Sequence, residues 1–238
     1  MKLIFVRHGE PLKHDYGIAD MGIAELKLLG EYFIDNFNIS EIHSADSQRA
    51  IESVSVINQK FNYNIKYHNW LSEFKYRIPA ITEEGVFPWQ FAPEHWINDN
   101  ELLGYESVFQ SELIKNSVVG QKSRQVWDGI DSLIRENGYE RKGNLYTVKE
   151  ANMNEIVVVT HFATMAVILA HLLNVSILVT LNLFYMAPSS YTVVSTEEIN
   201  SGKVIFRCLE IGSTKHLYDH NELKSEYGRQ AEVKSMEK

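Results

Sequence analysis

The chain has 238 residues, of which 45% are hydrophobic, and it carries a formal net charge of -8. This apolar content can build the core of one large α/β domain, and it argues against global disorder. The acidic balance argues against a protein that binds nucleic acid or a membrane surface in general. The single cysteine, Cys208, rules out an internal disulfide and a cysteine-based zinc site. Because no signal-like stretch precedes the first strand, we expect a cytoplasmic protein.

The first 70 residues alternate between patterns typical of strands and patterns typical of helices. The expected elements are a buried strand at 2–6, a helix at 20–37, a strand at 39–43, a helix ending near residue 60 and a strand at 63–68. Asp20 is the expected cap of the first helix, and Ser44 or Asp46 that of the second.

The segment from about residue 74 to residue 120 differs from its surroundings, because aromatic residues and prolines interrupt any regular period. We interpret it as an inserted helical cap over a pocket, with an irregular packed edge as the alternative. Several side chains could contact a substrate there or merely pack: Lys75, Arg77, Trp89, Phe91 and Trp96.

The second half continues the alternation of helix and strand. The expected elements are a helix around 126–134, a strand at 155–160, a helix at 162–173 and an antiparallel pair at 190–198 and 203–211. We therefore predict a three-layer α/β/α sandwich with a largely parallel central sheet and an inserted helical cap. Residues 1–212 would form this domain, with the cap at about 74–120, and residues 213–238 a charged helix or tail.

Two histidines directly follow buried strands: His8 comes after Arg7, and His161 ends the run "IVVVTH". Ligands bind beyond the carboxyl ends of parallel strands, so adjacent strands would bring both imidazoles to one site. Arg49 lies in the first turn of its predicted helix, where the helix dipole disfavours a cation. A bound anion would remove that conflict, and so would a nearby carboxylate. Each residue alone also has an ordinary structural explanation, such as a surface ion pair or a locally satisfied histidine.

The stretches "VRHGE", "HSADSQRA", "LSEF" and "VVVTH", in this order, resemble the histidine phosphatase superfamily, the phosphoglycerate-mutase-like proteins. The resemblance implies a metal-independent phosphoric monoester hydrolase with His8 as nucleophile, Glu73 as proton donor and His161 as a further catalytic residue. It also implies that the phosphoryl group is held by Arg7, Arg49, His161 and Phe162. Arginine suits this task because it is always charged and can contact two phosphate oxygens at once.

Two of the chain's departures from the family pattern lie directly beside expected site residues. Phe162 stands where relatives often have a small residue, and Phe74 stands where mutases have an arginine for the substrate carboxylate. We therefore expect a phosphatase that hydrolyses a small phosphorylated molecule through a phosphohistidine. A phosphoglycerate mutase, a catalytically inactive phosphate-binding protein and a histidine-based metal hydrolase are the alternatives. The expected partner is the small phosphorylated substrate, with no cofactor, metal, nucleic acid or membrane, and the sequence leaves a homodimer open.

Overall fold

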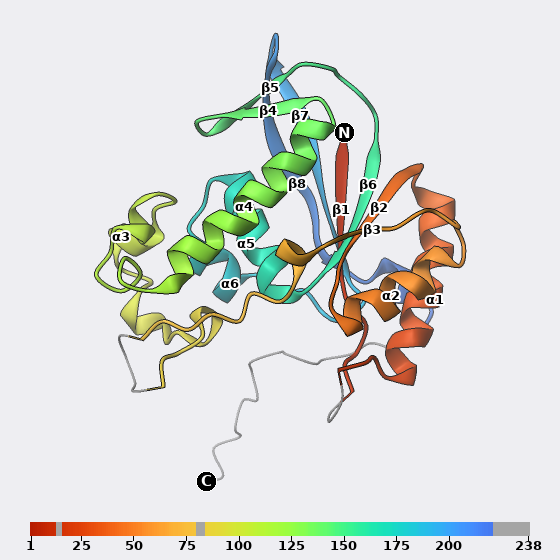
Figure 1. Cartoon of the computed structure of the whole chain (residues 1–238), viewed down its shortest axis with the longest axis horizontal. Helices are drawn as coiled ribbons and strands as arrows, with labels where there is room; N and C mark the ends of the chain where they lie inside the picture. The colour runs from red at the N-terminus through yellow and green to blue at the C-terminus, as the bar shows by residue number, and fades with distance from the viewer. Residues whose placement is uncertain (13–15, 80–83, 221–238) are drawn as a thin grey trace.

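The computed structural model describes residues 1–12, 16–79 and 84–220, which form an eight-stranded sheet with helices on both faces (Figure 1). The strands are β1 (Lys2–Arg7), β2 (Ile39–Ala45), β3 (Lys66–His68), β4 (Tyr139–Lys142), β5 (Leu145–Val148), β6 (Glu155–Thr160), β7 (Tyr191–Asn200) and β8 (Lys203–Ser213). The α-helices are α1 (Asp20–Asn36), α2 (Gln48–Asn58), α3 (Asn100–Leu103), α4 (Val118–Glu136), α5 (Phe162–Leu173) and α6 (Ile177–Leu183).

The strand order β3-β2-β6-β1-β7-β8-β5-β4 divides the sheet into two parts. The strands β3, β2, β6 and β1 are parallel to one another, and every pairing from β1 to β4 through β7, β8 and β5 is antiparallel. The predicted α/β fold is confirmed, but the sheet is mixed rather than largely parallel. The antiparallel part consists of the predicted β7–β8 pair and a β4–β5 hairpin that the sequence did not indicate.

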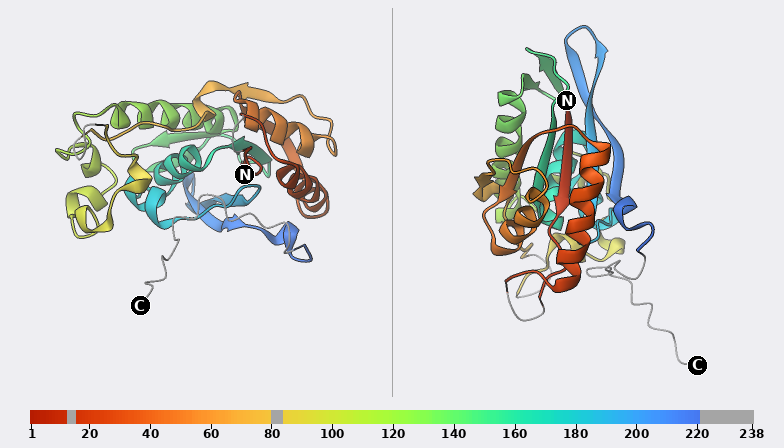
Figure 2. Two further views of the ribbon diagram at one scale, coloured as in Figure 1. Left: turned by 90° about the horizontal axis from the view of Figure 1, so that it is seen from below. Right: turned by 90° about the vertical axis from the view of Figure 1, so that its right-hand side faces the viewer.

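The helices cover the two faces of the parallel strands in separate pairs. Helices α1 and α2 pack together on one face, and α4 and α5 pack together on the other (Figure 2). The strands between them are buried on both faces: all six residues of β6 and the last five of β1 are buried. This explains why both strands are continuous apolar runs rather than alternating ones.

The predicted caps of α1 and α2 are wrong by one to three residues. Ala19 is the N-cap of α1, and Asp20 is its first helical residue. Strand β2 extends to Ala45, so Ser44 lies inside the strand, where its hydroxyl donates to the carbonyl of Ala45. Ser47 then occupies the N-cap position of α2.

Before α4 begins at Val118, the described part of the 74–120 segment contains only short helices. Besides α3 there are three 3₁₀ turns: Pro88–Gln90, Pro93–His95 and Ser107–Phe109. Trp96 and Phe91 are buried in the core, at 1% and 5% exposure, which is the packing role that the sequence left open for them. The segment packs against α6, an element the sequence did not indicate, and Asn182 of α6 donates to the carbonyl of Pro88.

The end of the described chain lies close to the start of the fold. After β8, a 3₁₀ turn at Lys215–Leu217 packs against α1. Most of the expected charged helix or tail, residues 221–238, lies outside the described residues. Among the helices of the described ranges, none has both the length and the apolar composition needed to cross a membrane.

Candidate active site

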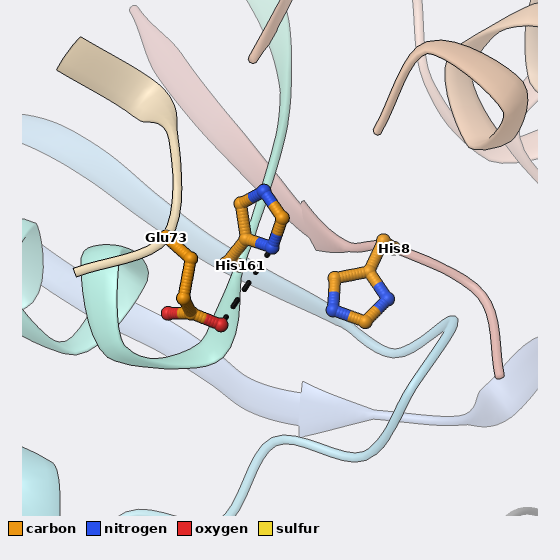
Figure 3. Close-up of side chains that lie close together, drawn as sticks. All are labelled: His8, Glu73 and His161. Atoms are coloured by element: carbon orange, nitrogen blue, oxygen red, sulfur yellow. Dashed lines mark ion pairs between the residues drawn. The ribbon is translucent and has the colours of Figure 1, made fainter. Parts of the chain in front are cut away.

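The two strand-end histidines meet at the carboxyl edge of the parallel strands. Arg7 is the register partner of Thr160 in the parallel pair β1–β6, so the next residues, His8 and His161, leave the sheet side by side. Their ring centroids are 4.9 Å apart, and both side chains are buried (Figure 3). The prediction that adjacent parallel strands bring these imidazoles together is confirmed.

The hydrogen bond of His8 determines which ring nitrogen is available for chemistry. Its Nδ1 lies 2.8 Å from the backbone oxygen of Gly9. Because a carbonyl can only accept, Nδ1 carries the proton, and Nε2 keeps its lone pair. Burial, followed by the neighbouring His161 and the guanidinium of Arg7, lowers the pKa of His8 well below its usual value. His8 is therefore neutral at neutral pH, as a nucleophile must be.

Two glycines let α1 approach the chain that follows His8. A Cβ atom on Gly22 would lie 2.5 Å from the backbone nitrogen of Glu10, and one on Gly9 would lie 3.2 Å from the Cα of Gly22. Gly9 is absent from the residues with positive φ, so it serves close packing and not a left-handed turn. Its N–H donates to Ser53 Oγ on α2 at 3.0 Å, which ties the loop after His8 to a second helix.

One edge of the His161 ring makes a hydrogen bond, and the other edge faces a carboxylate. Its Nε2 lies 2.7 Å from Ser47 Oγ, and its Nδ1 lies 3.6 Å from Oε2 of Glu73. Burial, together with the positive charges of Arg49 and Arg7, lowers the pKa of His161 to about 3. In this structure the ring is therefore neutral at neutral pH.

Glu73 belongs to an irregular segment that is fastened to β6 and α5. Thr164 Oγ1 donates to the carbonyl of Ser72 at 2.6 Å and accepts the N–H of Phe74 at 2.9 Å, so it binds the backbone on both sides of Glu73. The N–H of Ala163 donates to Glu73 Oε1 at 3.3 Å. These contacts aim the carboxylate at His161 (Figure 3).

The surroundings of Glu73 favour its protonated form. The carboxylate has limited contact with water, which raises the pKa of Glu73 above its usual value, although Arg7 and the N–H of Ala163 act in the opposite direction. The side chain is still 33% exposed, so solvent or a ligand can reach it. A carboxyl group with a raised pKa is suited to donate a proton near neutral pH.

Two guanidinium groups supply positive charge to the same space. Arg7 is buried, and its Nη1 donates to the carbonyl of Met186 at 2.7 Å. Arg49 lies in the first turn of α2, as predicted, and its buried Nε has no hydrogen-bond partner among the described residues. No described carboxylate forms an ion pair with Arg49. The unfavourable position of this cation in the first turn of α2 is therefore not offset by a carboxylate, and a bound anion is the remaining explanation.

Phe162, the first residue of α5, contacts one of these groups. The guanidinium carbon of Arg7 lies 5.6 Å from the centre of its ring, a cation–π contact. His161, the N-cap of α5, makes no side-chain cap bond, so the first backbone N–H groups of the helix have no partner from that residue. Binding of phosphate by the Phe162 N–H stays a prediction.

The donor set could in principle attract a metal ion. Ligand atoms of His8, Glu73 and His161 lie within 4.8 Å of one another, and no other group of three such residues occurs in the described ranges. His216 and His220 have the H-x-x-x-H spacing found in metal sites, but they do not belong to any such group among the described residues. Because two guanidinium groups act on the same histidines, the site favours an anion over a divalent cation.

The sequence did not indicate the residues that hold these groups in place. Ser47 and Thr164 contact their partners only after folding, and Gly22 matters because of a backbone that approaches it. The available signals were weak: Ser47 stands two residues before Arg49, and Thr164 three residues after His161.

Comparison with known proteins gives the fold a context. The family model of the histidine phosphatase superfamily (branch 1) matches residues 3–84. Among solved structures, the chain is similar to a mutant phosphoserine phosphatase from Entamoeba histolytica in complex with phosphoserine, at 19% identity over 91% of this chain and 98% of that chain, with a TM-score of 0.56. It is also similar to a mycobacterial glucosyl-3-phosphoglycerate phosphatase, at 15% identity over 88% and 97% of the two chains, with a TM-score of 0.58. No curated protein matches the chain. At these identities the structural likeness shows the fold alone.

Proposed function

We propose that the chain is a member of the histidine phosphatase superfamily, whose branch 1 model matches residues 3–84, and that it is a metal-independent phosphatase that hydrolyses a small phosphorylated molecule through a phosphohistidine. One observation carries the proposal. A neutral His8 with an available Nε2 lies beside His161, which faces the carboxyl group of Glu73, and the positive charges of Arg7 and Arg49 act on both rings.

In the first step, the phosphoryl group of the substrate binds between Arg7, Arg49 and His161. Nε2 of His8 attacks phosphorus in line with the ester oxygen, and a P–N bond forms as the P–O bond breaks. The electron pair of that bond goes to the leaving oxygen, which takes the proton of Glu73. The two guanidinium groups stabilise the charge that develops on the equatorial oxygens.

In the second step, water attacks the phosphorus of phospho-His8. Glu73, now a carboxylate, takes a proton from this water, the P–N bond breaks, and its electron pair returns to Nε2. Inorganic phosphate leaves, and Glu73 is protonated again for the next turnover. The arginines supply the positive charge that a metal ion provides in other phosphatases, so the scheme uses no metal.

The surroundings of Glu73 disfavour the mutase alternative. Phe74 is 1% exposed and packs against Tyr76 with ring centroids 5.1 Å apart, so its position offers no group for a substrate carboxylate. Arg77 donates to the carbonyl of Gly85 and stacks on Phe87 at 4.2 Å. Without a carboxylate anchor, a phosphoglycerate would not be held for transfer of the phosphoryl group back to it. The solved relatives of this fold include enzymes named as phosphatases, which also supports hydrolysis.

A screen of phosphorylated metabolites for release of inorganic phosphate tests the proposal. We expect the wild-type chain to hydrolyse at least one small monoester with equal rates in the presence and absence of a chelator. His8→Ala should abolish this release, whereas His95→Ala, which replaces an exposed histidine that is not one of the site residues, should not. Turnover that a chelator abolishes, or that His8→Ala retains, would contradict the proposal.

A further inference from the structure

Ser47 occupies an N-cap position without acting as a helix cap. N-cap serines normally accept a hydrogen bond from a backbone N–H of the first turn. Ser117 does so for α4, and Ser176 does so for α6. Ser47 makes no such bond to α2, and its Oγ lies 2.7 Å from Nε2 of His161. The hydroxyl is therefore turned from the helix toward the candidate active site.

This contact spans a large sequence separation and fixes the ring of His161 at its Nε2 edge. Residues 47 and 161 are 114 positions apart, and they meet because β2 and β6 are parallel neighbours that end at the same edge. At the opposite edge, Nδ1 faces Glu73 at 3.6 Å, which is too long for a hydrogen bond. Ser47 is thus the group that makes a hydrogen bond of normal length with the imidazole.

The surroundings of His161 disfavour a positive charge on its ring while the site holds no anion. The charged or titratable groups that act on it are Arg7 at the end of β1, His8 directly after it, Arg49 from α2, and Glu73 and Lys75 from the segment after β3. Four of these five are basic residues. A bound phosphoryl group would bring about two negative charges into their midst and favour a protonated imidazole.

A hydroxyl can serve both states of the ring without moving its oxygen. It donates to Nε2 when the imidazole is neutral there, and it accepts from Nε2–H when the imidazole is protonated, because its hydrogen rotates freely. Resting on the proposed function, we propose that Ser47 is a positioning residue for the phosphatase reaction: it holds the His161 ring in place and lets it gain a proton when the phosphoryl group binds.

Variants of Ser47 test this role. Ser47→Ala removes the hydroxyl, and Ser47→Thr keeps it. Ser55→Ala is the matched control, because Ser55 is an exposed serine of the same helix that bonds only the carbonyl of Ile51. For Ser47→Ala we expect a fall in kcat of about 5- to 30-fold, the equivalent of one buried hydrogen bond, with a smaller effect on KM. Ser47→Thr and Ser55→Ala should keep most of the wild-type rate.

A second readout follows the ring itself. Nitrogen-15 NMR reports the protonation of each ring nitrogen, and the His161 signals are those missing in His161→Gln. Sulfate serves as the anion because its charge stays constant across the pH range in which His161 is titrated. In the wild-type chain, sulfate should raise the pH at which His161 takes up a proton. In Ser47→Ala, the Nε2 signal should differ from the wild type even without sulfate.

The outcomes separate this role from the proposed function. Wild-type kcat and unchanged His161 signals in Ser47→Ala would overturn the role of Ser47. So would a loss of kcat in Ser47→Ala accompanied by a fall in thermal stability like that of Ser117→Ala, since this would mean a structural cap. Absence of any turnover in the wild-type chain, with the NMR changes as expected, would instead refute the phosphatase proposal, while it would still support Ser47 as the residue that holds the His161 ring and permits its protonation when an anion binds.

Discussion

Replacing Thr164 by valine should separate the placement of Glu73 from the rest of the site. Threonine and valine have nearly the same shape, so Thr164→Val removes the hydroxyl and little else. That hydroxyl accepts the N–H of Phe74 and donates to the carbonyl of Ser72, on either side of Glu73. The variant therefore releases the backbone on both sides of the proposed acid without touching its carboxyl group.

The structure sets the size of the effect on stability. The variant leaves a buried N–H and a partly buried carbonyl without their partner, and an unsatisfied buried group costs about 1–3 kcal/mol. Because water can reach the carbonyl of Ser72, we expect a loss of about 2–4 kcal/mol in the free energy of unfolding. Thr180→Val is the control: Thr180 is equally buried, but it donates only to the carbonyl of Ile177, at 3.2 Å, so it should lose about 1 kcal/mol.

Urea denaturation measures the stability, and the kinetic test compares two substrates. An alkoxide leaving group needs a proton from Glu73, whereas p-nitrophenolate leaves without one. Displacement of Glu73 should lower the hydrolysis of an alkyl phosphate by up to about 10²-fold and that of p-nitrophenyl phosphate much less. Equal losses on both substrates, or no loss on either despite lower stability, would refute the argument that Thr164 positions Glu73.

Three further predictions concern the loop after His8, the proton of Glu73 and the anion site. Gly22→Ala places a Cβ atom 2.5 Å from a backbone nitrogen, so it should lower the free energy of unfolding by about 1–3 kcal/mol, measured by thermal unfolding, and also lower activity. Gly30→Ala in the same helix, where the nearest atom to the new Cβ is at 3.3 Å, should lower the free energy of unfolding less. Because Glu73 acts in its protonated form and its pKa is raised, the rate of alkyl phosphate hydrolysis should fall as the pH rises through that pKa. In Glu73→Gln this fall in rate should disappear. A fall that persists in the variant would belong to another titrating group. Arg49→Ala should lower kcat/KM by about 10²- to 10³-fold and abolish the rise in melting temperature caused by vanadate. Arg207→Ala, which replaces an exposed arginine of β8, should change neither quantity. A wild-type vanadate response in Arg49→Ala would show that Arg49 does not bind the anion.

The parts of the fold that could be predicted are those that leave a local pattern. The apolar runs of β1 and β6 reveal strands buried on both faces, and the residues that follow such strands gather at one edge of the sheet. This reasoning, together with the motif resemblance, predicts that His8, His161, Arg49 and Glu73 share one candidate site. The β4–β5 hairpin was missed because its two strands have four residues each and mixed polarity.

The contacts that hold the site together could not be predicted, because they depend on which distant residues meet. The two extra residues of β2 moved the start of α2, so Ser47 and not Asp46 lies at the N-cap position. Nothing near Ser47 in the chain indicates that its hydroxyl reaches His161. Likewise, Thr164 is one of two polar residues in an otherwise apolar helix, and its two bonds to the Glu73 segment appear only in three dimensions.

The most direct test of the account is to trap the covalent intermediate. The chain is mixed with a substrate labelled in its phosphoryl group, quenched within one turnover, and digested to locate the label. We expect a phosphoryl group on His8 that is lost in acid and kept in base, and none in His8→Ala. A label on any other residue, or turnover of the substrate without any labelled His8, would contradict the mechanism.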